Sequence, residues 1–209
     1  MTSNHRISAR TAAVLTCVLG ILATQAPAET GTEAEAVALV TKFQQQILDA
    51  DARLAAAPFE ERYQAFAPIV TESHDLDYMA RVTMSRAWRS VEPNDRAQFL
   101  ALFHDLSIAN YATQFSGMAG ARFSVEGHRA ISGGRVEVQT VLSPAGEDAV
   151  ALVYLLHPTD AGWRVINVLA EGVSDLALKR SQYQQILKAQ GFEAVLTHLR
   201  RQIDALRAS

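Results

Sequence analysis

Four consecutive segments in the second half of the chain have strand character and are joined by short turns, and this pattern constrains the fold most. The segments cover residues 122–131, 135–142, 149–157 and 163–169, and each of the three turns between them contains glycine. Parallel neighbours would need a crossover of about a dozen residues or more, so strands joined this tightly are antiparallel. The sequence therefore predicts a four-stranded antiparallel meander.

Alternation within these segments predicts which face of the sheet is buried. In the second segment, mainly apolar positions alternate with polar ones: Val136, Val138, Thr140 and Leu142 against Glu137 and Gln139. Successive side chains of a strand point to opposite faces, so one face of this strand is expected to be wet. The third segment is apolar at nearly every position, which predicts a central strand covered on both sides.

Helical periodicity occupies the chain on both sides of the predicted sheet. Before the sheet we expect helices over 33–56, 59–70 (interrupted near Pro68), 75–91 and 93–115. After it, Ser174 is a suitable N-cap for a helix that reaches about Lys188, Gly191 ends that helix, and a last helix covers 192–206. The order predicts an α+β domain with about six helices packed on a curved antiparallel sheet.

The first 28 residues have the order of a secretory signal peptide. Arg6 and Arg10 precede an apolar stretch over 12–23, and the small-x-small sequence Ala26-Pro27-Ala28 follows. The stretch is shorter than the roughly 20 residues of a transmembrane helix. We expect residues 1–28 to be removed, which leaves one periplasmic domain over 29–209. An uncleaved anchor and a lipoprotein site at Cys17 are the alternatives.

Removal of that segment changes the charge and the cysteine content. The chain has 19 Lys+Arg and 22 Asp+Glu, and the segment holds two of the basic residues and no acidic one, which leaves 17 against 22, a net charge of −5. A mildly acidic chain lacks the basic footprint of a nucleic-acid-binding protein. Cys17 is the sole cysteine, so the mature chain would have no disulfide, cysteine metal ligand or cysteine nucleophile.

No catalytic or metal-binding motif stands out. His74, Asp75 and Asp77 lack the spacing of a helical zinc motif or a calcium loop, and a polar helix cap is the better interpretation. His104 and Asp105 are neighbours on a predicted helix, so their side chains point in different directions. No Gly-x-Ser-x-Gly sequence marks a serine nucleophile. We therefore predict no catalytic residue, no metal and no cofactor.

The predicted helices carry more large apolar side chains than contact with one neighbouring helix requires. The predicted helix over 93–115 alone carries Phe99, Leu102, Phe103, Leu106, Ile108, Tyr111 and Phe115. An ordinary core accounts for most of them. A sheet with helices packed on it can also leave an apolar cavity between its layers.

The late part of the chain resembles the MlaC, or toluene-tolerance, proteins of the Gram-negative periplasm. The resemblance rests on Gly162-Trp163-Arg164-Val165-Ile166-Asn167-Val168, Glu171-Gly172-Val173-Ser174 and Arg180-Ser181-Gln182-Tyr183, and on earlier positions that include Met79, Trp88, Phe103 and Tyr111. Asn167 stands where that family usually has Asp. The segment Tyr111–Gly117 with Gly120–Phe123 is more similar to the hopanoid-associated branch called HpnM.

The resemblance implies a lipid-binding carrier that is not an enzyme. Such a carrier buries the tails of a phospholipid or a hopanoid-type lipid and passes it between an inner-membrane transporter of ABC or RND type and an outer-membrane lipoprotein complex. A lipid with on the order of 30 methylenes, at about 0.8 kcal/mol each, does not cross water unaided. We expect a monomer. The alternatives are a non-catalytic envelope assembly protein with a filled core and a small-ligand enzyme with a similar cavity.

Two sets of residues are predicted to line the lipid cavity, one from the sheet and one from the helices. The sheet residues are Val136, Val138, Leu152, Tyr154 and Val165, and the helix residues are Met79, Trp88, Phe103, Tyr111 and Phe115. The alternation of the strands places the first set on one face. This assignment puts Val138 at a cavity wall and not in a solid core.

Overall fold

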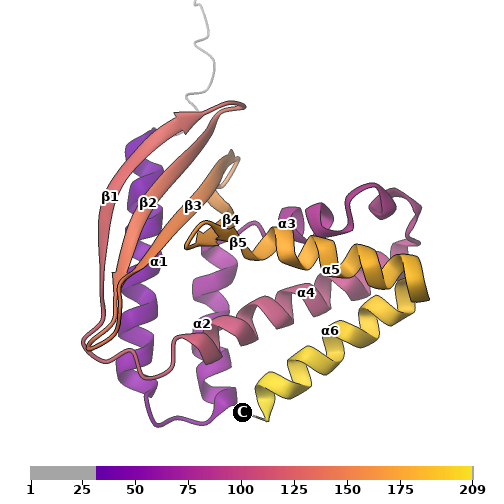
Figure 1. Ribbon diagram of the computed structural model, residues 1–209, viewed down its shortest axis with the longest axis horizontal. Coiled ribbons are helices and arrows are strands. Elements are labelled where there is room, and N and C mark those ends of the chain that lie inside the picture. The colour runs from indigo at the N-terminus through magenta and orange to yellow at the C-terminus, as the bar shows by residue number, and fades with distance from the viewer. Residues whose placement is uncertain (1–31, 209) are drawn as a thin grey trace, which may run out of the picture.

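Six α-helices, one 3₁₀-helix and a five-stranded sheet form the part of the chain that the computed structural model describes, residues 32–208 (Figure 1). The predicted signal peptide, residues 1–28, lies outside it. The helices are α1 (Glu33–Leu54), α2 (Phe59–Ser73), α3 (Leu76–Met84), the 3₁₀-helix η1 (Ser85–Ser90), α4 (Pro93–Gln114), α5 (Asp175–Gln190) and α6 (Phe192–Arg207). The strands are β1 (Arg122–Ile131), β2 (Arg135–Ser143), β3 (Val150–Thr159), β4 (Gly162–Ala170) and β5 (Val173–Ser174).

The predicted antiparallel meander is confirmed, with one strand added. Strand order follows chain order, and every pair of neighbours is antiparallel. The prediction of four strands missed β5, in which Val173 and Ser174 pair with Ala170 and Leu169. Two residues are too short to give a periodic signal.

Two helices differ from their predictions for local reasons. α2 continues through Pro68 because this proline lies on the exposed side of the helix, where water can hydrate the carbonyl that lost its hydrogen bond. The helix predicted over 75–91 is divided instead into α3 and η1. Ser85 follows α3 with φ 52° and ψ −130°, and this backbone conformation cannot continue an α-helix.

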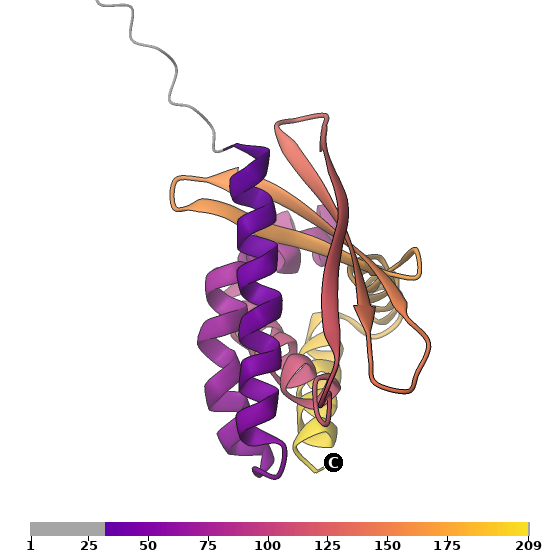
Figure 2. The same ribbon diagram turned by 90° about the vertical axis from the view of Figure 1, so that its left-hand side faces the viewer.

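Helix α1 covers one face of the sheet, and the other helices form a second body beside it. Figure 2 shows α1 running alongside the curved strands with α2 next to it, and α1 contacts β1, β2 and β4. α4 packs against α2, α3 and α6, while α5 packs against α3 and α6. Helices α2, α3 and α5 also contact β4, so they join the two parts. None of the helices in residues 32–208 is long and apolar enough to cross a membrane.

One part of the hydrophobic core lies between α1 and the predicted buried face of β2, and the core continues among the other helices. Val136 and Val138 are buried, and Gln44 of α1 donates a hydrogen bond of 3.0 Å to Thr140 on the same face. The prediction that β3 is covered on both sides is wrong. Its residues Leu152, Tyr154 and Leu156 are buried, whereas Val153 and Leu155 are half-buried and Ala151 is exposed, because the helices cover only one face of the sheet.

A buried ion pair fixes the end of α4. Arg62 of α2 lies 3.0 Å from Asp51 of α1, and both side chains are at most 5 % exposed. Arg62 also donates to the backbone carbonyls of Leu54, Ala112 and Phe115, and Asp51 also accepts from the backbone N–H groups of Gly117 and Met118. A buried pair is stable only with such additional bonds. This cluster, which the sequence analysis did not single out, joins α1, α2 and the end of α4.

Candidate functional site

A cavity of about 240 Å³ lies between the sheet and helices α3, α4 and α5. Its volume is just below the roughly 300–1,000 Å³ of small-molecule sites. Its walls are formed by His74, Leu76, Met79, Ser107, Asn110, Tyr111, Gln114, Phe115, Leu152, Tyr154, Val168, Ala170, Val173, Asp175, Leu176 and Lys179.

One wall of the cavity is apolar and comes mainly from the sheet. Leu152 pairs with Ala170 and Tyr154 pairs with Val168, so the four side chains share one face of β3 and β4. The apolar surface continues onto α3, β5 and α5 with Leu76, Met79, Val173 and Leu176. This wall can cover the hydrocarbon part of a ligand.

The wall formed by α4 is polar. Ser107, Asn110, Tyr111 and Gln114 are spaced i, i+3, i+4 and i+7, so they share one side of the helix. The Ser107 hydroxyl donates to the Phe103 carbonyl over 2.7 Å, and the Asn110 amide donates to the Leu106 carbonyl over 2.9 Å. A cavity with one apolar and one polar wall suits an amphiphilic ligand.

His74, at the end of α2, closes the inner end of the cavity and is fixed by hydrogen bonds on both ring nitrogens. Its Nδ1 lies 2.8 Å from the Ser73 hydroxyl and its Nε2 lies 3.0 Å from the Tyr111 hydroxyl. The backbone here is held as well, because His74 forms a parallel bridge with Val165 of β4. Only 4 % of the residue is exposed. Burial lowers the pKa of His74 to about 4, against an opposing effect of the Val70 carbonyl, so the ring is neutral at pH 7.

The two tyrosines of the cavity are also neutral. Burial raises the pKa of Tyr111 well above its ordinary value and raises the pKa of Tyr154 to about 12. The Tyr111 ring stacks on Phe115 at a centroid distance of 5.7 Å and an interplanar angle of 14°. The cavity therefore has neutral walls near its inner end.

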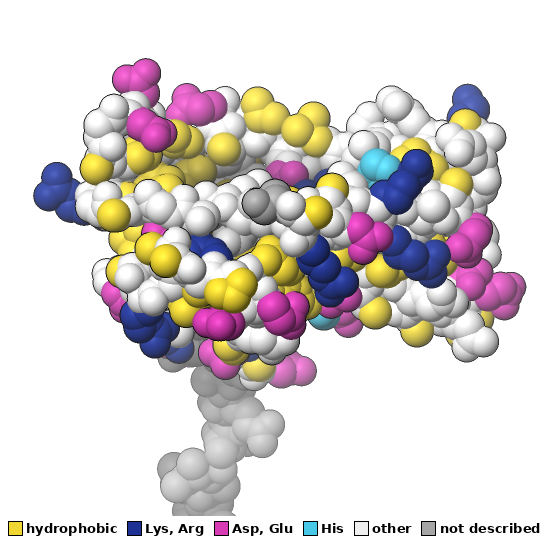
Figure 3. Space-filling model, turned by 90° about the horizontal axis from the view of Figure 1, so that it is seen from below, with side chains coloured by type: hydrophobic (Ala, Val, Ile, Leu, Met, Phe, Trp, Pro, Cys, Tyr) yellow, Lys and Arg dark blue, Asp and Glu magenta, His cyan; other side chains and the backbone are white. Residues whose placement is uncertain are grey.

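The cavity reaches the surface beside the start of α5. Asp175 and Lys179 form an ion pair there, with side chains 66 % and 17 % exposed. Ser174 caps α5, as predicted: its hydroxyl accepts from the N–H of Ala177 and donates to the Asn167 amide oxygen. Figure 3 shows that, on the face seen from below, basic and acidic side chains are interspersed with hydrophobic ones, so that face has no broad basic area.

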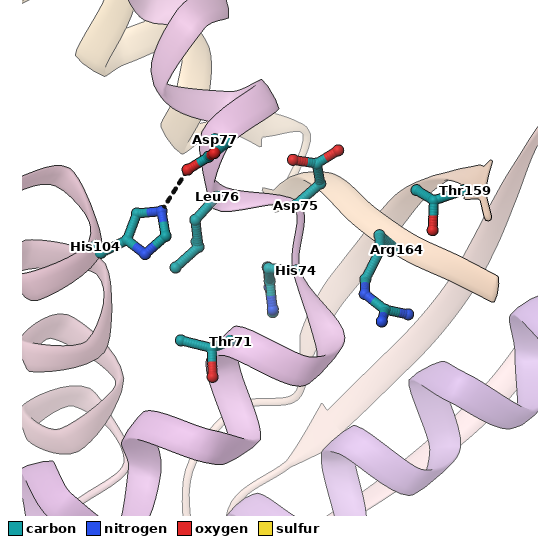
Figure 4. A pocket seen from close by; sticks show the side chains of 8 residues that line it. All are labelled: Thr71, His74, Asp75, Leu76, Asp77, His104, Thr159 and Arg164. Carbon is teal, nitrogen blue, oxygen red and sulfur yellow. Dashed lines mark hydrogen bonds and ion pairs between the residues drawn. The ribbon is translucent and has the colours of Figure 1, made fainter. Parts of the chain in front are cut away.

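A second, shallower depression of about 310 Å³ lies on the other side of His74 (Figure 4). It is lined mostly by polar groups, and its Asp77 and His104 are joined over 2.8 Å. Asp75 accepts from the N–H of Tyr78, which confirms that this segment caps α3, and also bonds to His157 over 2.9 Å. Within residues 32–208, no three His, Cys, Asp or Glu side chains are arranged to hold a metal. This depression lacks an apolar wall for lipid tails.

The structure brings five of the ten predicted site residues together at the cavity: Met79, Tyr111, Phe115, Leu152 and Tyr154. The other five, Trp88, Phe103, Val136, Val138 and Val165, do not line it. Trp88 and Phe103 pack on Phe99 at centroid distances of 6.2 and 6.1 Å, toward the start of α4. The three valines lie in the solid core. Whether a bound lipid reaches any of the ten stays a prediction.

The sequence analysis missed the polar wall and the β4 part of the apolar wall. Two signals in the sequence point to them. The alternation applied to Leu152 and Tyr154 extends across the next turn to Val168 and Ala170 on β4. The second half of α4 also places Ser107, Asn110 and Gln114 at helical spacing beside Tyr111.

Comparison with known proteins places the chain in a family. The family model described as MlaC protein matches residues 37–201, which contain every residue of the cavity wall. The chain belongs to the MlaC family. The resemblance noted in the sequence is thus confirmed, whereas its hopanoid-associated branch stays a prediction. A comparison of this MlaC-family chain with curated proteins finds no match.

A solved structure has the same fold as this MlaC-family chain. It is the phospholipid-binding protein from Ralstonia solanacearum, in complex with a phospholipid. The two chains are 20 % identical, the match covers 82 % of this chain and 98 % of the other, and the TM-score is 0.74. At this identity the match establishes the fold, including helices packed around an antiparallel sheet.

Proposed function

We propose that this protein binds a lipid in the cavity between the sheet and α4 and carries it across the periplasm. The observation that carries the proposal is the pairing of an apolar wall, with Leu152 and Val168, and a polar wall, with Ser107 and Asn110. The apolar wall can cover the tails of an amphiphile, and the polar wall can form hydrogen bonds with its polar part. Membership of the MlaC family and the phospholipid complex of the Ralstonia protein support the same ligand class.

The size of the cavity indicates how a lipid would be seated. A cavity of about 240 Å³ is small for a diacyl lipid, since sites for drug-sized ligands span roughly 300–1,000 Å³. A diacyl lipid has on the order of 30 methylenes, each contributing about 0.8 kcal/mol when buried. Seating both tails therefore requires the sheet and α4 to move apart. The free energy of tail burial is large enough to drive such a separation.

The protein is proposed to act without catalysis. Both nitrogens of His74 are already hydrogen-bonded, and its pKa of about 4 leaves it a weak base. Tyr111 and Tyr154 are weaker acids than usual, because burial raises their pKa. The cavity thus offers polar contacts but no activated acid or base.

The cellular role follows from the family and the predicted leader. After cleavage at residue 28, the domain over 29–209 would receive a phospholipid or a hopanoid-type lipid and pass it between an inner-membrane transporter of ABC or RND type and an outer-membrane lipoprotein complex. Val173, whose side chain is 54 % exposed, lines the cavity where it reaches the surface and would give the lipid an apolar exit.

Uptake from vesicles tests the proposal. Lipid-stripped protein is incubated with vesicles of phosphatidylethanolamine and phosphatidylglycerol, separated from them, and assayed for bound lipid. We expect close to one lipid per protein. Protein that stays folded and takes up no lipid from any vesicle would refute lipid carriage and favour an assembly role.

A further inference from the structure

We propose that the side chains of His74 and Leu76 form a partition that ends the lipid cavity and sets the longest tail that the protein accepts. The inference rests on the proposed lipid-binding function and concerns the length of the tails. It follows from the place of this partition between the cavity and the polar depression, from the bonds that hold it there, and from the charges at the other end of the cavity.

The partition separates two spaces that lie next to each other along α4. His74 and Leu76 line both the cavity and the depression, whereas His104 lines only the depression and Ser107 only the cavity. Residues three apart on a helix share one side and differ by about 4.5 Å along its axis. Without the partition, the cavity would therefore continue into the depression, among the polar side chains of Figure 4.

The backbone of the partition is attached to the sheet. His74 forms a parallel bridge with Val165 of β4, and the N–H of Asp75 donates to the Val165 carbonyl over 2.9 Å. The same strand carries Val168 and Ala170 of the apolar wall. The partition therefore keeps its position relative to this wall when the sheet and α4 move apart.

The His74 side chain can contact a hydrocarbon end without an unmade hydrogen bond. The Ser73 hydroxyl donates to the Ile69 carbonyl and so accepts from Nδ1, while the Tyr111 hydroxyl donates to Nε2. The Phe43 ring also packs against the imidazole, at a centroid distance of 4.9 Å and an interplanar angle of 71°. Both nitrogens are satisfied and the ring is held, so a terminal methyl group meets a fixed surface.

The tails point toward the partition because the charged groups of the cavity lie at its other end. Among the cavity-lining residues of the described chain, Asp175 and Lys179 are the charged ones at pH 7, and they lie at the mouth. A charged headgroup stays at the mouth, since burial of an ion is costly. The apolar wall leads from Val173 at the mouth to Leu76 at the partition. The tails can follow this wall as far as His74.

Such a partition predicts a sharp limit in tail length. A methylene that passes from the apolar interior of a vesicle to an apolar cavity changes little in free energy, so uptake is nearly independent of length while the cavity covers the tail. Beyond the limit, each uncovered methylene loses about 0.8 kcal/mol, which is about fourfold in uptake. Uptake plotted against tail length should therefore be level and then fall steeply.

Competition within one vesicle measures the limit. Phosphatidylethanolamines with two identical saturated tails, from lauroyl to behenoyl, are present in small equal amounts in fluid vesicles. Lipid-stripped protein is incubated with the vesicles, and mass spectrometry of the protein fraction gives the uptake of each lipid relative to its amount in the vesicle. We expect a level region followed by a fall of about fourfold or more for each further methylene.

Two variants assign the limit to the partition. His74→Ala removes the imidazole and should move the fall to longer tails, so that lipids just beyond the original limit gain about fourfold in uptake for each methylene newly covered. Leu76→Ala opens the same partition without removing the imidazole, and it serves if His74→Ala does not fold. Leu199→Ala is the matched control, because Leu199 is fully buried in the core and lines neither space. This control should keep the original limit.

Each failure has its own meaning. Level uptake over the whole series by the unaltered protein would overturn the limit and leave lipid carriage intact. An unchanged limit in folded His74→Ala or, failing that variant, in Leu76→Ala would show that the tails end elsewhere and would overturn the inference. An equal shift in Leu199→Ala would overturn it as well. No uptake of any lipid would instead refute the proposed function.

Discussion

The Tyr111 hydroxyl donates to Nε2 of His74 over 3.0 Å, and this bond joins the last turn of α4 to the end of α2 at the inner end of the cavity. Burial lowers the pKa of His74 to about 4, so a group that is usually half-protonated near pH 6.5 stays neutral. The same bond therefore holds the two helices together beside the cavity and is formed by two neutral side chains.

The first prediction is a loss of stability in acid that depends on His74. In the unfolded chain His74 becomes protonated below about pH 6.5, whereas in the folded chain it stays neutral until about pH 4. The contribution of neutral His74 to the free energy of unfolding is therefore complete above pH 6.5. It is lost as the pH falls toward 4, at about 1.4 kcal/mol per pH unit. Denaturant unfolding across pH 4–7 should show a steeper loss for the unaltered protein than for His74→Leu. Parallel curves would contradict the prediction.

The second prediction concerns the buried pair of Arg62 and Asp51. Arg62→Leu should reduce the free energy of unfolding by about 3–5 kcal/mol, because it leaves a buried carboxylate without its cation. Glu193→Gln is the matched control, since Glu193 pairs with Arg200 at the surface and its side chain is 75 % exposed. We expect a change of less than about 1 kcal/mol there. Equal decreases in the free energy of unfolding of the two variants, measured with urea, would show that the buried ion pair stabilises the fold no more than the surface pair.

The third prediction separates core from cavity with one substitution at two sites. Val138 is fully buried and does not line the cavity, so Val138→Trp should overpack the core and cost about 1–3 kcal/mol or more. Val168 does line it, so Val168→Trp should cost less and reduce the amount of bound lipid. Thermal stability is compared after lipid has been stripped, because bound ligand stabilises the folded state. If Val138→Trp bound less lipid than Val168→Trp, the lipid would lie beside Val138 and the cavity assignment would be contradicted.

The fourth prediction concerns the leader. The basic residues, apolar stretch and Ala26-Pro27-Ala28 predict cleavage after Ala28, so the intact mass of the periplasmic protein should correspond to a chain beginning at Glu29. A membrane-bound protein that retains Met1 would contradict the periplasmic assignment.

The sheet was predictable from the sequence because its signals are local. Glycine-containing turns set the limits of β1 to β4 to within two residues, and alternation identified the buried face that includes Val138 and Tyr154. The fifth strand and the division at Ser85 were not predictable, because pairing of two residues and a single unusual φ leave no periodic pattern.

Only half of the cavity lining was predictable from the sequence. The alternation within a strand identifies the buried face of the sheet but does not tell which helix covers each part of that face. Val138 and Tyr154 are direct partners across β2 and β3, yet Tyr154 lines the cavity and Val138 does not. The difference arises from α1, whose Gln44 reaches Thr140 and which covers the β2 side of this face. The position of α1 depends on contacts distant in sequence.

Lipid carriage is tested most directly by what the protein holds in its own cell. The protein is purified without detergent from the periplasm of its native host, and its organic extract is quantified by mass spectrometry against protein amount. Tail burial makes release into water slow, so we expect close to one lipid per protein. Folded protein without extractable lipid, which also fails to take up lipid from vesicles, would contradict the carrier function.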